Sequence, residues 1–196
     1  MKKSIAAIFA NSIAAKQRFL DEYGEILESA IGDVVRTFRA GGKLLLFGNG
    51  GSAADAQHIA AEFVNRYLIE RRPLPAIALT TDTSALTAIA NDYGIADLFA
   101  KQIRALGQKG DVAIAISTTG NSANVLRALA VCRELGIRTI GLTGGSGGKM
   151  KNLVDHLLCV SATPVTPRIQ EAHILIGHVI CEMVDEVLFG AESKKA

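Results

Sequence analysis

Short apolar segments alternate with amphipathic segments along most of the chain, and this alternation predicts the fold. Five apolar runs are bounded by Gly, Pro or charged residues, at 44–47, 75–80, 111–117, 138–143 and 156–160. Runs of this length are typical of strands buried on both faces of a parallel sheet. Helical segments are expected between them, at 53–68, 83–90, 97–106 and 122–135. Right-handed connections then give an α/β fold, a three-layer sandwich around a five-stranded parallel sheet.

Both ends of the chain are expected to be helical. Two helices are predicted first, at 3–22 and 25–40, and Gly41-Gly42 is the expected C-cap of the second; a last helix is predicted at 168–189. The early apolar residues recur at helical spacing and are interrupted by polar ones, so we expect part of the mature fold rather than a signal peptide. Without repeats or linkers, one domain over 1–196 is expected, with a helical segment at 1–40 and an α/β core at 41–196.

Composition narrows the class of protein. Hydrophobic residues make up 49% of the 196 residues and charged ones 20%, which argues against disorder. No apolar run is long enough for a bilayer span, and the net charge of +2 comes from scattered residues, so neither a membrane nor nucleic acid is the expected partner. Cys132, Cys159 and Cys181 are odd in number and far apart, which indicates reduced core residues in a cytoplasmic protein.

The first predicted strand leads into the glycine-rich segment FGNGGSAADAQHIAAEF. Its glycines, Gly48, Gly50 and Gly51, let the backbone approach a ligand, and Ser52 or Asp55 is a candidate cap for the following helix. A helix N-terminus attracts anions. A plain tight turn is the simpler alternative, and a dinucleotide site is disfavoured because the spacing does not match G-x-G-x-x-G.

The third predicted strand leads into AISTTGNSANVL, where four hydroxyl residues surround Gly120: Ser117, Thr118, Thr119 and Ser122. One such hydroxyl would need no explanation beyond capping the next helix. Four of them beside a flexible glycine favour a phosphate site. Ligands bind parallel sheets at the carboxyl ends of the strands, where the connections diverge, so both loops are expected there.

Two helices carry candidate acid–base or metal-binding groups. His58 and Glu62 are four residues apart and share one helix face, where they could ligate a metal or pair a base with its partner. An exposed polar face is the commoner cause of such a pair, but this helix begins at the glycine loop. The last helix contains Gln170, Glu171, His173 and His178. His173, among Ile and Leu, is expected to be a buried, hydrogen-bonded residue.

These motifs together resemble the sugar isomerase (SIS) fold, and within it the phosphoheptose isomerases. The resemblance is carried by GNGGSAADAQHIAAEF and ISTTGNS, by LTTDTSALTAIANDYG at 79–94, by LTGGSGGKM at 142–150 and by RIQEAHILIGH at 168–178. It implies a cytoplasmic enzyme that converts D-sedoheptulose 7-phosphate into D-glycero-D-manno-heptose 7-phosphate through an enediol. That reaction begins ADP- or GDP-heptose biosynthesis, for lipopolysaccharide or another surface glycan.

The resemblance also implies roles for individual residues. The expected Zn²⁺ ligands are His58, Glu62, Gln170 and His178, with Glu62 as the carbon base and His178 as the opposing acid–base group. The expected substrate-binding residues are Asn49, Gly50, Gly51, Ser52, Glu62, Asn91, Asp92, Ser117, Thr118, Thr119, Ser122 and Gln170. Thr119 stands where the family commonly has Ser, which keeps the hydroxyl. Asn91 and Asp92 also suit a turn before Gly94, and Asp82 and Thr83 suit a helix cap.

Helix geometry constrains the metal site. On an unbroken helix, Gln170 and His178 lie ~12 Å apart along the axis, too far to bind one ion. Either different subunits supply them, or the helix begins after Gln170. The resemblance implies a homotetramer with shared active sites, in which the N-terminal helices pack in the oligomer.

Three other functions are alternatives to this one. A non-catalytic SIS relative that associates with the replication initiator is the first, but that branch lacks the full His, Glu, Gln and His set. An isomerase or lyase for a pentose or hexose phosphate is not excluded by the phosphate loop. A sugar-sensing regulator usually carries a DNA-binding domain, for which 196 residues leave no room.

Overall fold

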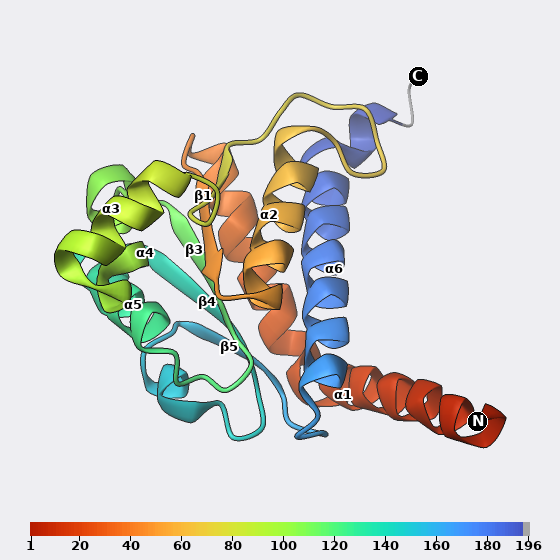
Figure 1. The fold of residues 1–196 in the computed structure, drawn as a ribbon. Helices are drawn as coiled ribbons and strands as arrows, with labels where there is room; N and C mark the ends of the chain where they lie inside the picture. Colours follow the sequence, from red (N-terminus) through yellow and green to blue (C-terminus); the bar gives the residue numbers. More distant parts are fainter. Residues whose placement is uncertain (194–196) are drawn as a thin grey trace.

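The computed structural model, which describes residues 1–193, is a parallel α/β sandwich (Figure 1). Its five strands are ordered β2-β1-β3-β4-β5, and all pair in parallel. Their bounds are β1 Leu44–Gly48, β2 Ala76–Ala78, β3 Val112–Ser117, β4 Arg138–Gly144 and β5 His156–Val160. The predicted fold is confirmed. The strand expected at 75–80 is shorter than predicted because it lies at the edge, pairs only with β1 and begins after Pro75.

Helices cover both faces of the sheet. One face packs against α1 (Lys2–Arg39), α2 (Gly51–Val64) and α6 (Thr166–Ser193). The other face carries α3 (Thr83–Tyr93), α4 (Leu98–Leu106) and α5 (Ala123–Leu135) (Figure 1). Short 3₁₀ turns lie at Ile95–Asp97 and Gly148–Asn152. Among the described helices, none is both long and apolar enough to cross a membrane.

Successive residues of a central strand serve opposite faces of the sheet. In β1, Leu44 and Leu46 pack with the helices α1, α2 and α6, whereas Leu45 and Phe47 pack with α4 and α5. All four side chains are fully buried. Full burial of a side chain of this size contributes about 1.5–3 kcal/mol, so a continuous apolar run is what a strand covered on both faces requires.

The N-terminal region is one helix instead of the two predicted. The helix α1 runs unbroken from Lys2 to Arg39 and passes through Gly24. A glycine inside a helix costs about 1 kcal/mol, but Phe19 and Leu27 on either side are buried in the core shared with α6 and offset that cost. The helix ends at Arg39 with Ala40 as its C-cap, and Gly41 follows with a φ of 80°, so the predicted end of the helix at Gly41-Gly42 is confirmed.

The topology brings the two candidate ligand loops together. The chain leaves β1 through α2 towards the edge strand β2, and it leaves β3 through α5 towards β4 on the other side. The connections therefore diverge between β1 and β3, whose ends are paired in register through Gly48 and Ile116. In parallel sheets this is the place where ligands bind.

Candidate active site

The first loop forms a tight passage from β1 into α2. Gly50 is the residue before the helix and has a φ of 56°, which favours glycine. A side chain at Gly48 would place its Cβ 2.8 Å from the carbonyl oxygen of Ile116, so only glycine fits there. No side chain caps α2, and the predicted capping by Ser52 or Asp55 is wrong. Backbone carbonyls of Asn49 and Gly50 accept the first helical N–H groups instead.

The second loop gathers hydroxyl groups at the end of β3. The Oγ atoms of Ser117 and Ser122 are 2.9 Å apart. Ser122 precedes α5 but its side chain makes no capping hydrogen bond, so capping does not explain this serine. Gly120 has a φ of 65°, and a Cβ there would lie 2.1 Å from the carbonyl oxygen of Gly147. Thr118 is half-buried and Thr119 is exposed.

A residue that the sequence did not single out joins the two loops. Asn124, in the first turn of α5, is buried and exchanges two side-chain hydrogen bonds with Asn49, of 2.9 and 2.8 Å. The Asn124 Oδ1 atom also accepts from the backbone N–H of Val125. This reciprocal amide pair fixes the orientation of Asn49. In the sequence, Asn124 stands out only as a second Asn after Asn121, and Asn next to Gly and Ser is common in turns without any further role.

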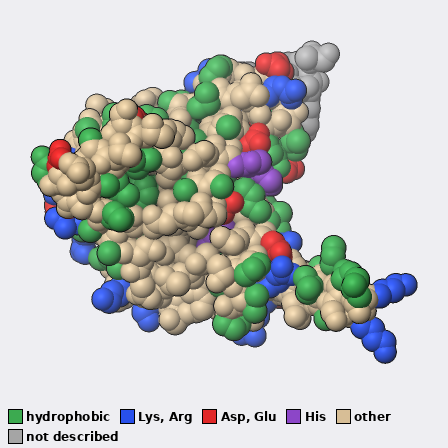
Figure 2. Space-filling view, in the orientation of Figure 1, with side chains coloured by type: hydrophobic (Ala, Val, Ile, Leu, Met, Phe, Trp, Pro, Cys, Tyr) green, Lys and Arg blue, Asp and Glu red, His purple; other side chains and the backbone are tan. Residues whose placement is uncertain are grey.

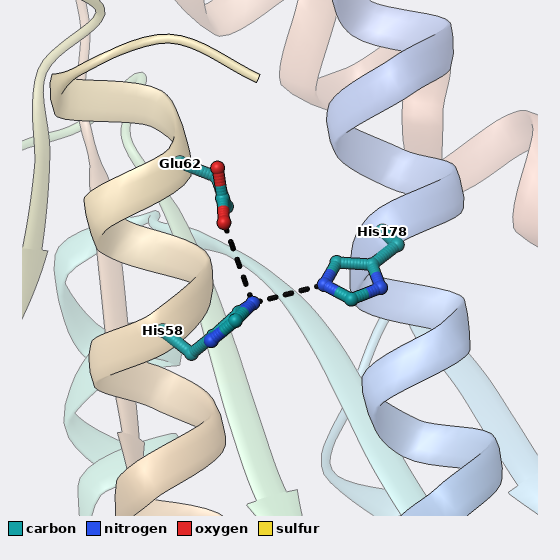
Figure 3. A group of neighbouring side chains, drawn as sticks. All are labelled: His58, Glu62 and His178. Atoms are coloured by element: carbon teal, nitrogen blue, oxygen red, sulfur yellow. Dashed lines mark hydrogen bonds and ion pairs between the residues drawn. The ribbon is translucent and has the colours of Figure 1, made fainter. Parts of the chain in front are cut away.

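Three of the predicted metal ligands meet two turns further along α2. Figure 3 shows His58 and Glu62 on α2 pointing towards His178 on α6. The Nε2 atoms of His58 and His178 are 2.9 Å apart, and Glu62 Oε1 lies 3.4 Å from His58 Nε2. The side chains of His58 and Glu62 are 49% and 26% exposed, so the cluster is open to a ligand. One ligand atom from each residue lies within 4.8 Å of the others.

A close helix contact brings this cluster together. Gly177 lies directly before His178, and a Cβ at this position would meet the Ile59 side chain at 2.4 Å. Since a larger residue would push α6 away from α2, the glycine lets the two imidazoles approach each other. Tyr67 completes the surroundings, because its ring stacks on His178 with 5.7 Å between ring centroids. The sequence analysis identified neither Gly177 nor Tyr67.

Gln170 lies apart from those three residues. Its Nε2 atom is 2.4 Å from the position that a Cβ on Gly51 would occupy, so it lies beside the first turn of α2. The helix α6 begins at Thr166 and is continuous through Gln170, which overturns the alternative that the helix begins after this residue. Eight residues of helix, ~12 Å, therefore separate Gln170 from His178 within one chain.

Other predicted residues occupy separate places. Asn91 and Asp92 are exposed at the end of α3, where Asn91 donates a hydrogen bond to Asp92. Asp82 caps α3 by accepting from the backbone N–H of Ala85, which confirms the expected cap. His173 is fully buried and 3.0 Å from the Thr143 carbonyl oxygen; burial lowers its pKa to about 4. The predicted core role of His173 is confirmed.

The three cysteines are free and buried, as predicted.

Asp55 lies one turn before His58 on α2. Burial raises the pKa of the Asp55 carboxyl, and the imidazole of His58 partly opposes that rise.

Comparisons with known proteins identify the family and agree with the fold. The profile of the SIS domain family matches residues 8–144. Phosphoheptose isomerase 2 of Campylobacter jejuni is 55% identical over 184 residues, which cover 93% of this chain and 91% of that protein. The solved structure of a phosphoheptose isomerase from Neisseria gonorrhoeae is 48% identical with a TM-score of 0.88, over 94% of this chain and 98% of that one. A phosphoheptose isomerase structure from Francisella tularensis is 39% identical with a TM-score of 0.90, over 94% and 97%.

The chain belongs to the SIS domain family. Its relatives at this identity and coverage are isomerases, so the predictions of an SIS fold and of an isomerase are confirmed.

Proposed function

We propose that this protein converts sedoheptulose 7-phosphate into D-glycero-D-manno-heptose 7-phosphate, as the first step towards a nucleotide-activated heptose. The observation that carries the proposal is the convergence of His58, Glu62 and His178 in an open cluster between α2 and α6. Two imidazoles and a carboxylate supply the proton-transfer groups that an aldose–ketose isomerisation needs. The names of the relatives point to the same substrate class.

The two loops at the switch point suit the phosphate end of the substrate. Ser117 and Ser122 place two hydroxyl groups 2.9 Å apart, and the loop into α2 starts at Gly48, which pairs with Ile116 next to Ser117. His58 follows Gly51 by seven residues, ~10 Å along the helix. A seven-carbon sugar phosphate carries its carbonyl and phosphate near opposite ends of its carbon chain. Two subsites that are separated along α2 therefore favour a longer sugar.

The reaction assigns complementary tasks to two side chains. Glu62 removes a proton from C1 of the ketose and returns it to C2. His178 moves a proton from the C1 hydroxyl to the C2 carbonyl oxygen, so an enediol forms and collapses to the aldose with no net gain or loss of protons. Both groups reach the open cluster from different helices (Figure 3), which lets them act on opposite sides of one substrate.

The donor set of this cluster fits zinc. Imidazole nitrogens and a carboxylate oxygen are its usual ligands, and three such atoms lie within 4.8 Å of one another. His58, Glu62 and His178 would hold the ion, with Gln170 of another copy as the fourth ligand. When bound, zinc would polarise the substrate carbonyl and stabilise negative charge on the oxygens.

A homotetramer with shared sites is part of the proposal. The first eleven residues of the chain are exposed, and the start of α1 projects from the body as an arm with apolar side chains on its surface (Figures 1 and 2). Ile8, Phe9 and Ile13 on this arm are each at least half exposed. An apolar hollow of about 330 Å³ lies nearby between α1 and α6. Exposed apolar surface of this kind is typical of protein interfaces.

The proposed location of the enzyme is the cytoplasm, where its phosphorylated substrate would be found.

Turnover of sedoheptulose 7-phosphate, followed by NMR, tests the proposed reaction. We expect conversion by the purified protein, loss of activity after chelation and recovery with zinc. A folded protein that converts pentose or hexose phosphates but not the heptose would reassign the substrate. A folded protein without turnover of any phosphosugar would favour the non-catalytic SIS alternative.

A further inference from the structure

Arg71 is the most completely hydrogen-bonded arginine beside the proposed site. Its side chain is 1% exposed, and that of its partner Asp185 is 4% exposed. Arg71 Nε donates to Asp185 Oδ1 at 2.9 Å, and Nη2 donates to the carbonyl oxygen of Glu62 at 2.9 Å. Nη1 is directed at three further carbonyl oxygens, those of Phe63, Asn65 and Arg72, at 2.8, 3.0 and 3.3 Å.

These contacts place a cation at the C-terminal end of α2. The last carbonyl groups of a helix have no partner within the helix and carry its negative dipole end. Arg71 supplies donors to them, including the carbonyl of Glu62 itself. The backbone of the proposed carbon base is therefore held directly by the guanidinium group, while its carboxylate stays free to face His58 and His178.

The same side chain connects α2 to α6. Asp185 follows His178 by seven residues, two turns of helix, so both lie on the side of α6 that faces α2. The bridge between Arg71 and Asp185 fixes the end of α2 against this part of α6. Arg72 adds a contact, because its guanidinium lies 5.8 Å from the centre of the Phe189 ring on α6.

Arg71 also closes the loop that carries Tyr67. Nη1 contacts the carbonyl oxygens of Asn65 and Arg72, which stand on either side of Tyr67 in the sequence. Within this closed loop the Tyr67 ring lies against His178, at an angle of 27° between the ring planes. One arginine thus holds the base, the second helix and the aromatic neighbour of the acid–base histidine.

Stability alone does not account for this buried pair. Burial raises the pKa of the Asp185 carboxyl against the opposing effect of Arg71, and Asp185 Oδ2 has no hydrogen-bond partner among the described residues. Buried ion pairs are often replaceable by apolar residues with no loss of stability. The arrangement is better explained by the geometry that it imposes on its neighbours.

We propose that Arg71 is a positioning residue, which holds Glu62 and Tyr67 in register with His178 through its bridge to Asp185. The expected effect of Arg71 on turnover rests on the proposed function, whereas its effect on the positions of the histidines does not. It assigns Arg71 no contact with substrate.

Two variants separate positioning from folding. Arg71→Lys keeps the positive charge but has one amino group, which cannot serve Asp185 and four carbonyl oxygens together. The double variant Arg71→Met with Asp185→Leu removes both charges and fills the same buried space with apolar side chains. Arg104→Lys is the matched control, because Arg104 pairs with Glu134 on the opposite face of the sheet.

Three measurements apply to each variant: kcat and KM for sedoheptulose 7-phosphate, zinc affinity, and the NMR signals of the four histidine rings. Loss of an outer-shell partner typically lowers activity or metal affinity about 10–100-fold. We expect a fall of this size in kcat and in zinc affinity, with KM near the wild-type value. The His58 and His178 signals should shift, while those of His156 and His173 and all results for Arg104→Lys stay unchanged.

Wild-type kcat together with unchanged His58 and His178 signals in Arg71→Lys would overturn the inference. So would a loss of kcat that only follows the folded fraction measured by thermal unfolding. If the wild-type protein does not turn over the heptulose phosphate, the proposed function fails. The histidine signals of the metal-free protein still decide whether Arg71 positions the cluster.

Discussion

Two histidine–carboxylate groups in this protein use the same chemistry for opposite purposes. At the amino ends of the strands, His156 of β5 lies 2.5 Å from Asp33 of α1, and their side chains are 11% and 7% exposed. Between α2 and α6, His58 and Glu62 are 3.4 Å apart and much more exposed. The first pair is closed by its neighbours, whereas the second faces a third group, His178, and is open to a ligand.

The two groups differ in how many hydrogen-bonded or charged partners each carboxylate has. Asp33 also pairs with Arg36 and lies 3.4 Å from Arg138. Burial would raise its pKa, but the hydrogen bonds from His156 and Arg36 lower it below the usual value. The Glu62 side chain has no comparable set of partners among the described residues. A carboxylate with several fixed partners stabilises the fold, while one with free lone pairs can take a proton or bind a metal.

The largest expected effect comes from Glu62→Gln, which removes the carboxylate and keeps its shape. A positioned acid–base group contributes about 10²–10⁴-fold to a rate, and we expect kcat to fall by that factor. Thermal unfolding should be nearly unchanged, because the side chain is 26% exposed and its 3.4 Å contact with the exposed His58 contributes little to stability. Glu186→Gln, on the exposed surface of α6, is the control. Full activity in Glu62→Gln would remove this residue from the catalytic role.

The remaining histidine sharpens the comparison, because His173 lies on the same helix as His178 but is fully buried. Its pKa is about 4 in the folded protein, against about 6.5 when unfolded. Between these values the unfolded chain binds the extra proton, so the folded state loses stability as the pH falls from 6.5 to 4. The full loss is about 3 kcal/mol.

Urea unfolding of the wild type and of His173→Leu across that pH range measures this loss. The variant should show a shallower dependence of the unfolding free energy on pH, whatever its stability at pH 7. Parallel curves for the two proteins would show that His173 does not contribute to acid sensitivity.

The closed pair itself is broken by Asp33→Asn. Hydrogen bonds to charged groups contribute about 1.5–3 kcal/mol, so we expect the unfolding free energy at neutral pH to fall by about that much. Because the pKa of Asp33 is lowered by folding, the difference from wild type should shrink as the pH drops below the usual carboxyl range. The kcat should stay at the wild-type value, and a large loss of kcat in the folded variant would contradict the separation of the two regions.

The smallest effect is expected at the hydroxyl loop. Ser122→Ala removes one hydroxyl from the pair with Ser117. The neutral hydrogen bond that orients Ser117 is worth about 0.5–1.5 kcal/mol, and its loss corresponds to a rise in KM of about 2–12-fold with kcat unchanged. Ser161→Ala, whose hydroxyl contacts Glu22 away from the sheet switch point, serves as the control. A fall in kcat with an unchanged KM would argue that this loop acts on the chemical step instead of on phosphate.

The hydrophobic pattern predicted most of the architecture. All five strands and the helices between them were predicted, because a strand buried on both faces needs an uninterrupted apolar run that leaves a clear signal. The break expected between two N-terminal helices was wrong, since Gly24 disfavours a helix locally but the packing of Phe19 and Leu27 against α6 keeps α1 continuous. Local propensity of about 1 kcal/mol is easily overridden by the burial of large side chains.

For the candidate site, too, local features were predicted from the sequence and long-range contacts were not. The types and spacing of His58, Glu62 and the hydroxyl loop were readable along the chain because each motif is local. Other contacts join residues that lie 75 to 120 positions apart: the approach of Gly177 to Ile59, the amide pair of Asn49 with Asn124, the bridge of Arg71 to Asp185, and the meeting of His58 with His178. Such contacts depend on where whole helices lie on the sheet, and a pattern of neighbouring residues carries no information about that.

The sequence by itself determined which chemical groups this protein has and which elements carry them. The tertiary structure decided that three of those groups meet between α2 and α6, and that Gln170 lies beside the first loop instead. The physical reason is that hydrophobic periodicity is set by each element alone, whereas the distance between two side chains on different helices is set by packing across the whole core.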